Sequence, residues 1–122
     1  MPELLSSEWF DEAQRVLAEL EATVSVDLTV RYEVSSTPHG KVAMNAVIAE
    51  GRIRELVSGP ADQADVIVSC SFEVAADLLA GRRDPHREYM TGGLKVEGAY
   101  AVWLLDLHPL RQVALPALAT LA

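Results

Sequence analysis

Residues 24–35 read VSVDLTVRYEVS and alternate strictly between apolar and polar side chains. An apolar residue at every second position is the pattern of a β-strand that buries one face and leaves the other wet. Strands of this kind are typical of antiparallel sheets, in which one face packs on a core while the other contacts water. This stretch therefore predicts the sheet around which the rest of the chain is arranged.

Further strands follow along the chain. Residues 42–48 repeat the alternation, and the dipeptide Glu50-Gly51 then turns the chain into another strand at 52–57. We expect these strands to form an antiparallel meander with the first. Residues 65–70 form a shorter and more apolar run, which predicts a strand nearer the middle of the sheet.

Helices are expected before and after these strands in the sequence. Residues 7–20 place apolar side chains at helical spacing, and Ser6 or Ser7 can cap the first turn. A second helix is expected at 72–80, where Ser71 can serve as the cap.

The C-terminal third is harder to assign. Residues 82–87 are polar and typical of a surface segment, and 94–97 predict a brief strand. Residues 99–107 carry apolar side chains on two faces, which predicts a helix that is buried on several sides or faces an apolar cavity. From Leu110 onward we expect a helix that is broken at Pro116 and whose apolar side needs a partner surface.

Length and charge limit the classes of function. The chain has 122 residues, which predicts a single domain over 1–122, and half of its residues are apolar. Its formal net charge is −8. Because affinity for nucleic acid comes largely from neutralising phosphates, this charge argues against DNA, RNA and anionic membrane surfaces as partners.

The compartment is inferred from what the sequence lacks. Cys70 is the one cysteine, so no internal disulfide can form. The N-terminal residues lack the basic region and the apolar stretch of a signal peptide, and no apolar run is long enough to cross a bilayer. We therefore expect a cytoplasmic protein without a transmembrane segment.

Few residues indicate chemistry. His39, His86 and His108 are far apart and have no neighbours at metal-ligand spacing, so we expect neither a metal site nor a cofactor. Cys70 shares a strand face with apolar residues and is interpreted as a small buried residue rather than a nucleophile. Three charged residues share the wet face of the first strand and are expected to pair with neighbours: Asp27, Arg31 and Glu33.

A motif near the C-terminus resembles a known family. Residues 88–98 read EYMTGGLKVEG and resemble the signature of the sterol carrier protein type 2 family, in which an aromatic-Met pair precedes Gly and a Leu-Lys-Val segment. Gly93 stands where this family commonly has Lys, and the peroxisomal ending is missing, which is similar to a bacterial-type stand-alone member. Other matching features occur in the family's order: Glu50-Gly51, Ala64-Asp65-Val66, Ala80-Gly81 and Asp84-Pro85.

The resemblance implies an α+β fold with a five-stranded, mostly antiparallel sheet covered by helices. It further implies an apolar tunnel that holds sterols, fatty acids or fatty acyl groups, and it brings no catalytic residues. The leading hypothesis is therefore the non-catalytic binding of an apolar lipid, extended to its transfer. The expected tunnel lining consists of Phe72, Leu79, Tyr89, Met90, Tyr100, Trp103, Leu104 and Leu107.

Two alternatives remain open. The chain could be a small enzyme or an enzyme-accessory module that uses the cavity for an apolar biosynthetic intermediate, with a carboxylate or His108 at the mouth as acid or base. It could instead be an interaction module, in which residues 110–122 pack against a second copy to form a homodimer or against another subunit.

Overall fold

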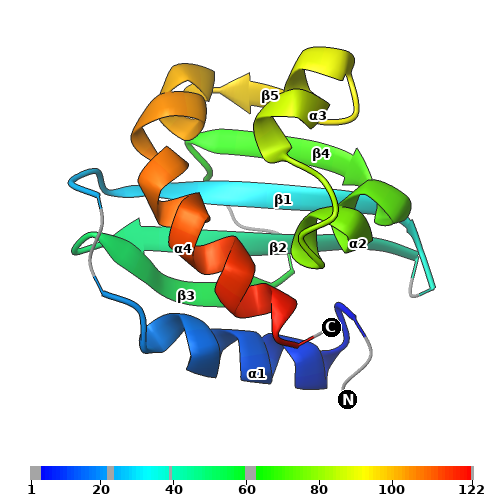
Figure 1. Ribbon diagram of the computed structural model, residues 1–122, viewed down its shortest axis with the longest axis horizontal. Helices are drawn as coiled ribbons and strands as arrows, with labels where there is room; N and C mark the ends of the chain where they lie inside the picture. The colour runs from blue at the N-terminus through cyan, green and yellow to red at the C-terminus, as the bar shows by residue number, and fades with distance from the viewer. Residues whose placement is uncertain (1–3, 22–23, 39, 60–62, 122) are drawn as a thin grey trace.

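The computed structural model describes residues 4–21, 24–38, 40–59 and 63–121. Figure 1 shows the arrangement of its helices and strands. Among the described residues, no helix combines the length and the apolar character that crossing a bilayer would require. In chain order the elements are α1 (Ser7–Ala18), β1 (Leu28–Thr37), β2 (Gly40–Ala49), β3 (Arg52–Ser58), β4 (Val66–Ser71), α2 (Phe72–Leu79), α3 (Pro85–Thr91), β5 (Lys95–Gly98), the short π-helix η1 (Val102–Asp106) and α4 (His108–Ala119).

The strands form one mixed sheet in the order β3-β2-β1-β4-β5. The expected meander is confirmed, because β1 pairs antiparallel with β2 and β2 pairs antiparallel with β3. β4 lies inside the sheet, as its apolar sequence predicted, and runs parallel to β1 and antiparallel to β5. The sheet is thus mostly antiparallel, and β1 is its central strand.

β1 begins at Leu28 rather than at Val24, where the alternation starts. Leu28 lies opposite Ile48, beside the end of β2, so residues 24–27 extend past the strand with which they would pair. The Val24 N–H instead donates to the carbonyl of Gly51 at 3.3 Å. The alternation therefore continues into a segment that packs apolar side chains without joining the sheet.

The first two helices begin where the serine caps predicted, and both end slightly earlier than expected. The Ser6 hydroxyl accepts a hydrogen bond from the Trp9 N–H at 3.2 Å. The Ser71 hydroxyl accepts one from the Val74 N–H at 3.3 Å. Each bond satisfies an N–H group that the helix itself leaves without a partner.

The helices lie against one face of the sheet. In Figure 1, α4 crosses in front of the strands, from the β5 side to α1. The helices α2 and α3 lie in front of the same face, and α1 packs alongside β3. Alternate side chains of the strands point into this layer, including Val30, Val34 and Val68, which are almost fully buried. On β1 the side chains that point to the other face include Arg31 and Glu33, and Glu33 forms ion pairs with Arg31 at 3.2 Å and with Lys41 at 3.5 Å.

The polar segment at 82–87 leads into a helix that the sequence reading did not predict. The Asp84 carboxylate accepts a hydrogen bond from the Arg87 N–H at 3.1 Å, and Pro85 occupies the first turn of α3. α3 ends at Gly92, whose φ of 90° is a left-handed conformation that glycine adopts without strain. Aspartate followed by proline is a helix-start signal, and the short length of α3 concealed its periodicity.

For residues 99–107 the alternative of burial on several sides is wrong, whereas the alternative of facing an apolar cavity holds for Trp103. Tyr100 is 54% exposed and Leu105 is 70% exposed, whereas Trp103 and Leu107 are each 2% exposed. The segment therefore buries one side only, and its outer apolar residues contact water.

The predicted break at Pro116 is also wrong, because α4 continues through this residue. Pro116 lies in the last part of the helix and removes a single N–H donor there. Leu110, Ala114 and Leu118 recur at helical spacing and are all buried in the core, which holds the helix together. The apolar side of the tail is thus covered by the chain itself, and a homodimer through this tail stays a prediction.

Candidate functional site

An apolar cavity of about 120 Å³ lies between the sheet and the helices. Its walls come from α1, the first four strands, α2, the start of α3, η1 and α4, so segments far apart in the sequence meet around it. The lining residues are Trp9, Leu17, Tyr32, Val34, Met44, Ala46, Ile53, Leu56, Val68, Cys70, Ala75, Leu78, Leu79, Pro85, Leu94, Trp103, Arg111, Ala114, Leu115 and Leu118.

Short side chains on facing elements leave this space open. Ala46 on β2, Ala75 on α2 and Ala114 on α4 all line the cavity and are all buried. Protein interiors are otherwise close-packed, and cavities cost about 24 cal/mol per Å³.

Three lining residues carry ionisable groups, among those that the structure describes: Tyr32, Cys70 and Arg111. Burial raises the pKa of Tyr32, whose hydroxyl accepts a hydrogen bond from Trp103 Nε1 at 3.3 Å. Burial also raises the pKa of the Cys70 thiol to about 11. Both groups are therefore neutral at physiological pH, and neither is an activated nucleophile or a general base.

Arg111 is held at the junction of η1 and α4. Its guanidinium donates hydrogen bonds to the carbonyls of Trp103 and Leu104, and it lies 4.1 Å from the centre of the Trp103 ring. Its Nη2 also lies 2.9 Å from His86 Nε2. Burial lowers the pKa of Arg111, but the group stays protonated because its ordinary pKa is far above neutral.

The predicted lining residues fall into three environments. Leu79 and Trp103 border the cavity. Phe72, Tyr89 and Leu104 are half-buried and pack against the core, and Leu107 is buried in it, but all four lie outside the lining. Met90 and Tyr100 are exposed, by 81% and 54%. The structure therefore brings two of the eight residues together at the cavity, and ligand contact by any of them stays a prediction.

Several lining residues were not predicted as such. Val34, Met44 and Ala46 lie on the inward faces of β1 and β2, and their alternation in the sequence marks them as inward. Trp9 lies on the apolar face of α1, which periodicity also identifies. The sequence gives no indication that Arg111 lines the cavity, because a single arginine in an apolar tail has the pattern of a surface residue.

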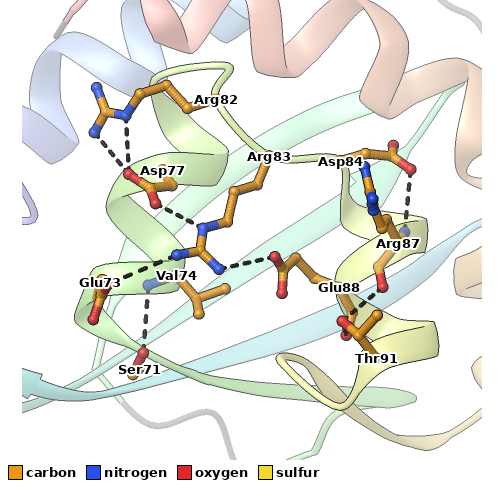
Figure 2. Close-up of polar contacts among 10 residues, drawn as sticks. All are labelled: Ser71, Glu73, Val74, Asp77, Arg82, Arg83, Asp84, Arg87, Glu88 and Thr91. Atoms are coloured by element: carbon orange, nitrogen blue, oxygen red, sulfur yellow. Dashed lines mark hydrogen bonds and ion pairs between the residues drawn. The ribbon is translucent and has the colours of Figure 1, made fainter.

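A cluster of ion pairs lies beside the cavity and connects α2 to α3 (Figure 2). Arg83 contacts Asp77 at 2.6 Å, Glu88 at 2.9 Å and Glu73 at 3.7 Å. Arg82 contacts the same Asp77 at 2.9 Å. Hydrogen bonds from Arg83 and Arg82 lower the pKa of Asp77.

These ion pairs hold the segment that joins α2 to α3, and a cavity-lining residue lies at each end of that segment: Leu79 at the end of α2 and Pro85 at the start of α3. Among the described residues, no group of His, Cys, Asp or Glu side chains is arranged to hold a metal ion.

An α+β fold that encloses an apolar cavity between a sheet and its helices defines a class of proteins suited to binding small apolar molecules. The model of the SCP-2 sterol transfer family matches residues 10–104 of this chain. The chain belongs to that family, which confirms the resemblance carried by residues 88–98.

Solved structures share this fold. A crystal structure of sterol carrier protein 2 matches with a TM-score of 0.78 and 22% identity, over 96% of this chain and 98% of that one. A conserved hypothetical protein from Thermus thermophilus matches with a TM-score of 0.70 and 16% identity, over 98% and 90%. Palmitated SCP2L2 from Aedes aegypti matches with a TM-score of 0.66 and 13% identity, over 90% and 95%. No curated protein sequence matches the chain.

Proposed function

We propose that this protein is a non-catalytic carrier that binds an apolar lipid in the cavity between its sheet and its helices. The observation that carries the proposal is the cavity itself, because a hollow of about 120 Å³ is lined almost wholly by apolar side chains. Burial of a lipid's methylene groups against these side chains would be favourable.

Family membership and one structural neighbour support the proposal. The family is described as one of sterol transfer, and the similar protein from Aedes aegypti is palmitated. A dozen buried methylenes, at about 0.8 kcal/mol each, supply about 10 kcal/mol before binding costs. The costs of association and ordering leave an affinity in the region of ~1 μM.

The size of the cavity adds a condition. A volume of about 120 Å³ is small for a whole fatty chain. A long ligand therefore either extends out of the cavity or requires a wall to move. The connection between α2 and α3 suits this role, because its ion pairs are partly exposed and such pairs contribute little stability.

The same cavity favours a carrier over an enzyme. A general acid or base that works near neutral pH needs a group that titrates there. Among the described lining residues, the ionisable groups are a buried phenol, a buried thiol whose pKa is about 11 and a guanidinium. None of these lining groups is suited to proton transfer near neutral pH, and the two histidines near Arg111, His86 and His108, lie outside the lining.

The test is a titration with a fluorescent fatty acid, using two variants and native mass spectrometry of gently purified protein. Trp103→Glu places a carboxylate at the cavity wall and is expected to abolish uptake, because an uncompensated charge is costly to bury. Lys95→Ala removes an exposed side chain on β5 and is expected to leave uptake unchanged. Equal uptake by both variants, or no retained apolar mass and no probe binding by the wild type, would contradict the proposal.

A further inference from the structure

Arg111 is unusual among the residues around the cavity. It is the one lining residue with a permanent charge in the part of the chain that the structure describes, and every other wall is apolar or neutral. Its guanidinium stacks on Trp103, which lines the same cavity. Arg111 thus brings a positive charge next to the cavity wall, on the side formed by Trp103.

Within the described residues, this charge forms no ion pair with a carboxylate. The ion pairs engage other arginines and one lysine, and Asp84 acts on Arg111 only through a longer-range attraction. A guanidinium has five N–H donors. The contacts to the Trp103 carbonyl, the Leu104 carbonyl and His86 leave donors that have no partner within the described residues. A partly buried charge without a paired counter-charge is costly, and an anionic ligand would compensate it.

Two histidine side chains, His86 and His108, lie near the Arg111 guanidinium. A guanidinium only donates, so His86 Nε2 must accept from Arg111 and the proton of the neutral ring lies on Nδ1. The ring of His108 lies 4.7 Å from that of His86, measured between ring centres. Both histidines are half-buried, at the start of α3 and of α4. They add N–H donors beside the guanidinium.

We propose that Arg111, supported by His86 and His108, binds the carboxylate head group of the ligand and makes this protein selective for acidic over neutral lipids. The inference rests on the proposed function, since it requires that a lipid chain occupy the cavity. Two of the residues, His108 and Arg111, lie beyond the family match, which ends at residue 104. His86 lies within the match, on the helix α3, and contacts Arg111. Arg111 would fix the orientation of the ligand, with the head group at the junction of α3 and α4.

Decanoic acid and decan-1-ol have equal chain lengths and differ in the head group, so their dissociation constants, measured by displacement of a fluorescent probe, test the proposal. The wild type is expected to bind the acid at least about tenfold more tightly, which is the range of one charge-assisted hydrogen bond. Arg111→Met should remove this preference while changing affinity for the alcohol by less than about threefold. Arg87→Met, which removes an exposed arginine on α3, is the matched control and should behave as wild type.

Each outcome decides between the two proposals. If the wild type binds acid and alcohol equally, or if Arg111→Met weakens both equally, Arg111 serves only to join η1 to α4, and the head-group proposal is wrong while the carrier proposal stands. If the wild type binds neither ligand, both proposals are wrong. Should Arg111→Met fail to fold, His86→Gln provides the second variant, with a reduced preference for the acid expected and an unchanged preference counting against the proposal.

Discussion

Filling the cavity from α4 is the sharpest test of the site. Ala114 lines the cavity and is 4% exposed, and leucine has nearly the same helix propensity as alanine. Ala114→Leu adds three carbon atoms to a space of about 120 Å³. At about 0.8 kcal/mol per buried methylene the gross gain is about 2.4 kcal/mol, from which some strain is subtracted. We expect the free energy of unfolding to rise by about 1–2 kcal/mol.

The same substitution should weaken lipid binding, because the added side chain and the ligand compete for one volume. We expect the dissociation constant of a fluorescent fatty acid to increase at least about tenfold, which corresponds to the loss of about two buried methylenes. Stability is measured by urea unfolding and binding by fluorescence titration on the same preparations.

Ala13→Leu provides the control. Ala13 is fully buried on α1 but lies outside the cavity lining, so a leucine there must displace packed neighbours. Such overpacking costs about 1–3 kcal/mol. If Ala114→Leu destabilises the protein as much as Ala13→Leu does, the space beside Ala114 is already filled. If stability rises but probe affinity does not change, the ligand binds elsewhere.

Two further predictions concern titratable groups. Burial raises the pKa of the Cys70 thiol to about 11. At pH 8 this thiol should therefore react with iodoacetamide about a hundredfold more slowly than it does in urea-unfolded protein. Mass spectrometry follows the reaction, and equal rates in the two states would contradict the burial of Cys70. Hydrogen bonds from Arg83 and Arg82 lower the pKa of Asp77, so its carboxylate stabilises the fold above the ordinary carboxyl pKa, and this contribution decreases as pH falls toward the folded-state pKa. Asp77→Asn should therefore lower the melting temperature more at pH 7 than at pH 3, and an equal difference at both pH values would refute this account.

Local chemistry made much of the fold predictable from the sequence. The alternation in β2, the Glu50-Gly51 turn before β3 and the serine caps of α1 and α2 depend on neighbouring residues, and all four elements were predicted near their observed positions. The order of the strands could not be obtained in this way. β1 and β4 are parallel neighbours although two strands separate them in sequence, and no local pattern in either strand indicates that pairing.

The candidate site was less predictable from the sequence, because large apolar residues do not mark the cavity wall in this fold. Met90 and Tyr100 are large and apolar, yet both are exposed, since single apolar side chains are common on protein surfaces. Short side chains on several elements border the cavity instead, namely Ala46, Ala75 and Ala114. Periodicity shows that these alanines point inward, but only the three-dimensional arrangement brings them to the wall of one cavity. Small residues at inward positions are therefore better indicators of a binding cavity in this fold than large ones, and substitutions at those alanines test it most directly.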